Sequence, residues 1–156
     1  MYTKSAERLN RHQPNDISDV SEVNDVRAAS REFVGKDIDL GKLASIVEDF
    51  FKADKYRTQR ADHPKGIVIQ ATKGGVLRTL LAEDRAFTVT ITGEPNHVKV
   101  SMGVGKWLKD LGIAAIEGFV ITPILLFVEV PLALWSFEIE QKFWRYLEQQ
   151  VELGLK

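Results

Sequence analysis

The sequence contains no cysteine. Disulfide bonds and thiolate metal sites are therefore excluded, and the absence fits a reducing compartment. The N-terminal segment from Met1 to Asp16 has no apolar run, so no secretory signal peptide is expected there. We expect a cytoplasmic protein, with a position peripheral to a membrane kept as an alternative.

The chain also lacks an excess of charge of either sign. Charged residues make up 28% of the sequence, yet the formal net charge is −1. Electrostatic binding of nucleic acid needs a clustered basic face, so no nucleic-acid partner is expected. The histidines, His12, His63 and His97, have no second ligand at metal spacing. We therefore expect neither a metal nor a cofactor.

Catalytic motifs are equally scarce. No G-x-S-x-G pattern is present. The run from Gly103 to Lys106 superficially resembles a phosphate-binding loop. However, Val100 stands where the Walker pattern requires glycine, and Trp107 stands where it requires serine or threonine. The sequence thus predicts a protein that is not an enzyme.

The most apolar part of the chain is the block from Gly105 to Val151, which holds all three tryptophans. A membrane-spanning helix needs about 20 mostly apolar residues in a row. Glu117 and Glu129 interrupt this run, and Pro123 and Pro131 break regular helix within it. The block therefore predicts helical pieces, which we place at 106–121, 123–130 and 132–151.

Residues 1–36 are polar and form a predicted N-terminal arm. Within the arm, Ile17, Val20, Val23 and Val26 recur every three residues. This weak stripe indicates at most a marginal helix, from Ser18 to about Phe33. We assign residues 37–156 to a single domain.

The single domain begins with a clear amphipathic helix. Leu40, Leu43, Val47 and Phe51 share one face at helical spacing, which predicts a helix over residues 40–53. Asp37 or Asp39 is placed to cap it.

The pattern then changes to a period of two. Strands are predicted at 56–61, 66–72, 87–92 and 98–104, in two hairpins, with 76–83 left open between helix and irregular structure. Phe87, Val89 and Ile91 face inward in this scheme, and Thr88 and Thr90 face outward. The expected fold is a two-layer α+β sandwich. A four-stranded antiparallel sheet is covered on one face by the first helix and the long apolar C-terminal helices.

Surplus apolar surface is the main clue to function, because large exposed apolar patches usually mark contacts. We therefore expect a non-enzymatic protein-binding or assembly domain that self-associates or docks a partner through its C-terminal helices. The predicted interface residues are aromatic: Trp107, Phe119, Phe127, Trp135 and Trp144.

Two alternatives stay open. One is a membrane-associated domain with an interfacial apolar helix region. The other is a carrier of a small apolar ligand, in which Glu117 or Glu129 is a buried acid that orients the ligand.

Overall fold

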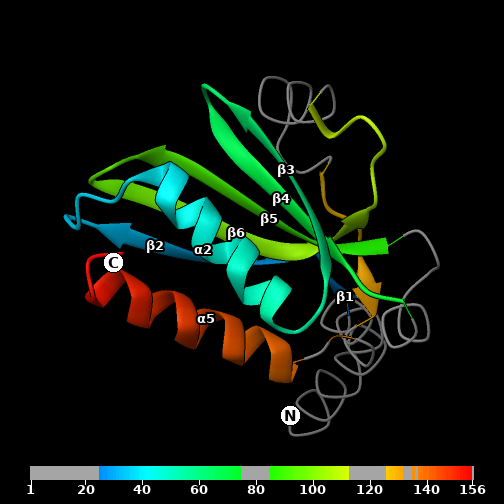
Figure 1. Cartoon of the computed structure of the whole chain (residues 1–156). Helices are drawn as coiled ribbons and strands as arrows, with labels where there is room; N and C mark the ends of the chain where they lie inside the picture. Colours follow the sequence, from blue (N-terminus) through cyan, green and yellow to red (C-terminus); the bar gives the residue numbers. More distant parts are fainter. Residues whose placement is uncertain (1–24, 75–84, 113–125, 132–134, 136, 156) are drawn as a thin grey trace, which may run out of the picture.

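The computed structural model describes residues 25–74, 85–112, 126–131, 135 and 137–155 (Figure 1). It shows an α+β fold with a five-stranded antiparallel sheet in the order β2-β6-β5-β4-β3. The strands of this sheet are β2 (Ala28–Val34), β3 (Arg57–His63), β4 (Gly66–Thr72), β5 (Arg85–Glu94) and β6 (His97–Lys106). A separate two-stranded pairing joins β1 (Asp25–Val26) to β7 (Val130–Pro131). The described helices are α2 (Leu40–Ala53) and α5 (Phe137–Glu152).

Helix α2 has the bounds that the sequence predicts. The carboxylate of Asp39 caps it by accepting a hydrogen bond from the Lys42 N–H at 3.0 Å. Leu43, Val47 and Phe51 on its inner face are fully buried against the sheet. Each such side chain contributes on the order of 1.5–3 kcal/mol through burial.

Helix α5 lies on the same face of the sheet, next to α2 (Figure 1). Its buried side is narrow and includes Phe143 and Leu147, while most of its other positions carry charged or amide side chains. The ring of Phe143 meets Phe50 edge-on at 5.3 Å and stacks on Phe51 at 5.9 Å between centroids. This aromatic cluster holds the two helices together.

The register places alternate residues of each strand in the helix-covered core. Phe87, Val89 and Ile91 are buried there, as the alternation predicts. On β2, Arg31 and Phe33 stand opposite Val100 and Val98, so their side chains share this face. Because α2 and α5 supply the cover, this side forms the main core.

The opposite face of the sheet is not simply the solvated side that the threonine alternation suggested. Gln70, Thr88 and Thr90 are buried there. A second apolar cluster of Val68, Leu111, Leu126 and Phe127 also covers part of this face. The segments 107–112 and 126–128 therefore pack across strands β4 to β6.

Several boundaries differ from the sequence-based expectation. The sheet has five strands, because residues 28–34 pair with β6 rather than forming a marginal helix. Strand β6 continues to Lys106, so no helix begins there. Residues 126–131 are mostly extended, with Val128 bridged to Val104. Residues 76–83 and 113–125 lie outside the described part of the chain.

Glycines in β6 explain why the segment 126–128 can approach this strand so closely. A Cβ on Gly103 would collide with the Arg27 carbonyl oxygen and come within 2.7 Å of the Phe127 ring. A Cβ on Gly105 would collide with the Leu126 carbonyl oxygen and come within 2.7 Å of Thr88 Oγ1. Both positions therefore require the absence of a side chain.

Candidate functional site

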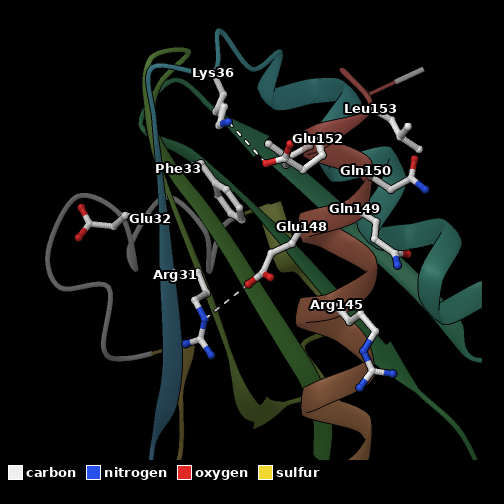
Figure 2. Close-up of a pocket in the computed structure, with 11 residues that line it drawn as sticks. Arg31, Glu32, Phe33, Lys36, Arg145, Glu148, Gln149, Gln150, Glu152 and Leu153 are labelled. Atoms are coloured by element: carbon white, nitrogen blue, oxygen red, sulfur yellow. Dashed lines mark ion pairs between the residues drawn. The ribbon is translucent and has the colours of Figure 1, made fainter.

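A hollow lies between strand β2 and helix α5 (Figure 2). It has a volume of about 610 Å³. Arg31, Phe33 and Lys36 line it from the strand side, and Arg145 and Glu148 line it from the helix side. We call this hollow, together with its continuation described next, the β2–α5 groove.

A second hollow of about 450 Å³ shares Arg31, Arg145 and Glu148 with the first and continues it to Phe137 at the start of α5. The combined groove therefore follows the full helix. Sixteen helical residues extend for about 24 Å. The seven residues of β2 extend for about 23 Å. The helix lines the groove from Phe137 to Glu152, and β2 lines it with Arg31, Glu32 and Phe33.

Strand β2 is at the edge of the sheet. Within the described ranges it pairs only with β6, which occupies one of its two sides. An edge strand presents unpaired backbone N–H and C=O groups, and these can pair with a strand from another chain. The strand wall of the groove therefore offers main-chain hydrogen-bonding groups next to the side chains of α5.

Two ion pairs bridge the groove, as Figure 2 shows. Arg31 lies 3.9 Å from Glu148, and Lys36 lies 3.6 Å from Glu152. All four side chains are about half exposed or more. Exposed pairs of this kind contribute little net stability, because water screens them. Breaking these ion pairs therefore costs little free energy, and their charges can pair with those of a bound molecule. Glu32 also lines the hollow, but its carboxylate points away from α5 (Figure 2) and lies 2.7 Å from His97 Nε2.

The floor of the groove near its middle is Trp144. The guanidinium carbon of Arg31 lies 5.0 Å from the centroid of this ring, which is a cation–π contact. Trp144 is 4% exposed, and its indole N–H has no acceptor among the described residues. Such an unpaired buried donor is uncommon and calls for an explanation.

The predicted aromatic residues are mostly inside this one chain. Phe127, Trp135 and Trp144 are buried. Trp135 donates a hydrogen bond from its indole to Glu140 and meets Phe87 edge-on at 6.2 Å. Trp107 is half-buried beneath the Arg57 guanidinium, 4.7 Å from its ring centroid. Their packing is therefore accounted for without a second chain, although Trp144 also forms part of the groove floor.

Of the other candidates, Phe119 and Glu117 lie outside the described residues. Glu129 is exposed rather than buried, and it pairs with Arg27 at 2.5 Å. A role for Glu129 as a buried acid is therefore wrong. The apolar context that suggested burial is local in sequence, but β1 and β7 bring Arg27 beside the carboxylate.

Sequence reasoning missed the strand wall of the groove. Ala28 to Val34 contains both charges and small residues, which hid its period of two. The available signal was the alternation of Ala29, Arg31 and Phe33 on one face, and it was too short and too polar to outweigh a helical stripe.

Two kinds of site do not occur in the described part of the chain. No group of three or more His, Asp or Glu residues there is arranged to hold a metal ion. No helix within those ranges has the length and apolar character needed to span a membrane.

No protein-family model matches this chain, and the search of curated proteins returned no match.

Proposed function

We propose that this chain is a protein-binding domain in which the β2–α5 groove receives an extended segment of a partner protein as an added strand on β2. The observation that supports this proposal is that β2 is an edge strand whose residues Arg31 to Phe33 line the same groove as α5. Strand addition uses main-chain hydrogen bonds for affinity and neighbouring pockets for selectivity.

The two walls of the groove supply both requirements. The edge of β2 provides the hydrogen-bonding ladder. From α5, Arg145 and Glu148 provide charges of both signs, and Leu153, with 62% of its surface exposed, provides an apolar contact at one end. A segment of about seven residues would fill the groove, because an extended chain advances about 3.3 Å per residue.

A displayed library of random peptides, each about ten residues long, tests the proposal without a known partner. Peptides selected by the wild-type chain should bind with the backbone amides of β2 newly protected from hydrogen exchange. Amides of β3, the other edge strand, should be unchanged. Arg145→Glu reverses a charge that lines the groove. It should reduce binding of the selected peptides about three- to tenfold.

Lys42→Glu is the matched control, because Lys42 is an exposed lysine on α2 and does not line the groove. It should leave peptide binding unchanged. Equal losses in the two variants, or new protection confined to residues outside β2 and α5, would contradict the proposal. Molecular mass in solution identifies self-association: a concentration-dependent dimer that Arg145→Glu dissociates would mean that the added strand comes from a second copy.

A further inference from the structure

A second hollow lies on the other side of α5, where it meets the C-terminal end of α2 and Tyr56. Its volume is about 500 Å³. Four aromatic residues line it, namely Phe50, Phe51, Tyr56 and Tyr146, together with the carboxylates of Asp49 and Asp54. We call this hollow the aromatic pocket. None of these residues lines the β2–α5 groove.

The aromatic rings are held in place by packing. The centroids of Phe50 and Tyr146 are 5.5 Å apart. Phe51 contacts Phe50 at 5.1 Å and Tyr56 at 5.4 Å between centroids. Phe50, Tyr56 and Tyr146 are each half-buried, so part of each ring is open. Aromatic faces carry negative electrostatic potential and attract cations.

The charges at the rim favour the same kind of ligand. Asp49, Asp54 and Glu138 line the pocket, and Lys142 is the only lysine or arginine among the described residues that does so. Lys142 is already engaged, because it pairs with Glu138 at 3.0 Å on the same helix. Asp54 pairs with Lys73 at 3.4 Å, so Asp49 is the carboxylate that leaves a net negative charge at the rim.

The protein itself places an ammonium group in this setting. The Nζ atom of Lys73 lies 5.1 Å from the Tyr56 ring centroid and 3.4 Å from the Asp54 carboxylate. Lys73 does not line the pocket, so this contact is at its border. It shows that one ring and one carboxylate of the pocket already stabilise an alkylammonium ion.

We propose that the aromatic pocket binds an alkylammonium group, preferably a methylated one, against the open parts of the Phe50, Tyr56 and Tyr146 rings. A methylated ammonium is only weakly hydrated, so rings can replace its water at little cost, as in known sites for quaternary ammonium ligands. This inference is independent of strand addition in the β2–α5 groove, and either can fail alone.

The test compares isosteric ligands by amide chemical-shift titration. Choline is the cationic probe, and 3,3-dimethylbutan-1-ol has the same shape without the charge. Choline should shift the amides of Phe50, Tyr56 and Tyr146, and the neutral analogue should bind at least about threefold more weakly. A peptide carrying trimethyllysine, beside its unmodified form, shows whether the ammonium group comes from a small molecule or from a protein.

Three variants complete the test. Tyr146→Leu removes a ring and should weaken choline binding about three- to fivefold, whereas Tyr146→Phe keeps the ring and should retain binding. Asp54→Asn removes an exposed carboxylate without disturbing the core and should also weaken binding. Lys142→Gln removes the competing cation and should strengthen it. Equal binding of choline and the neutral alcohol, or unchanged binding in folded Tyr146→Leu and Asp54→Asn, would overturn the proposal.

Discussion

On the less covered face of the sheet, the side-chain carboxamide of Gln70 accepts a hydrogen bond from the peptide N–H of Leu108. Its Oε1 accepts from the Leu108 N–H at 3.0 Å, and its Nε2 donates to the Lys106 carbonyl oxygen at 2.6 Å. Gln59 closes the network by donating to Gln70 Oε1 and to the Leu108 carbonyl, each at 2.8 Å. A fully buried amide thus fastens the segment after β6 to the sheet.

Replacing Gln70 with leucine should therefore be costly despite the similar volume. The substitution removes this partner from the Leu108 N–H and the Lys106 carbonyl, in a partly buried setting. We expect the free energy of unfolding to fall by about 2–4 kcal/mol, measured by urea denaturation. Gln141→Leu, at an exposed position of α5, is the control and should change stability by less than about 0.5 kcal/mol. Similar effects of the two substitutions would argue against the network.

A second prediction concerns the close crossing at Gly103. Gly103→Ala should destabilise the fold by about 2–3 kcal/mol, because the added methyl group would collide with the Arg27 carbonyl oxygen and the Phe127 ring. Thermal unfolding measures the change. Gly112→Ala is the matched control, since a Cβ there meets no atom of the described residues within 4 Å. If Gly103→Ala were as harmless as Gly112→Ala, the packing of 126–128 over β6 would be wrong.

A third prediction concerns the contact between Arg31 and Trp144 in the β2–α5 groove. A double-mutant cycle with Arg31→Met and Trp144→Phe should give a coupling energy of about 0.5–1 kcal/mol in favour of the native pair. Methionine keeps an apolar stem over the ring but removes the charge, so the coupling reports the cation–π term. A second cycle with Arg145→Met and Trp144→Phe is the control, because Arg31 is the residue with a cation–π contact to this ring among those described. A coupling energy of zero would mean that Arg31 is free to leave the groove floor without cost.

These residues also show what the sequence could and could not reveal. Helix α2 was predictable to the residue because its cap at Asp39 and its apolar face are local signals. The hairpins were predictable for the same reason, since Phe87, Val89 and Ile91 alternate within one strand. The inward-facing side of these strands was therefore correct as well.

Strand β2 was not predictable in this way, because its structure depends on a partner about 70 residues later: Ser30 stands opposite Ser101. The burial of Gln70 and Thr88 likewise depends on segments 107–112 and 126–128, which fold back over the sheet. The alternation of polar and apolar residues along β4 and β5 assigns Gln70 and Thr88 to the same face of the sheet, which is correct. It could not show that this face is covered.

The candidate site was likewise predictable only in part. The apolar character of Trp135 and Trp144 was visible in the sequence, but their burial within one chain depends on tertiary packing. The charges of the β2–α5 groove come from β2 and α5, which are distant in sequence. Only the pairing of β2 at the sheet edge brings Lys36 and Glu152 to opposite walls.

The last prediction concerns the pH dependence of stability at Tyr56. Burial raises the pKa of its phenol above the ordinary value of about 10, and the nearby Asp54 carboxylate raises this pKa further. The unfolded chain therefore loses this proton at lower pH than the folded chain. The stabilising contribution is fully present below pH 10 or so and is lost as the pH rises through the folded-state pKa.

Urea denaturation between about pH 8 and pH 11 checks this sign. The free energy of unfolding of the wild type should fall more steeply above pH 10 or so than that of Tyr56→Phe, which has no proton to lose. Lysine ionisation affects both chains equally and cancels in the comparison. Asp54→Asn removes the smaller cause, so its curve should lie between the other two. Parallel curves for wild type and Tyr56→Phe would show that the phenol is not desolvated by the packing around the aromatic pocket.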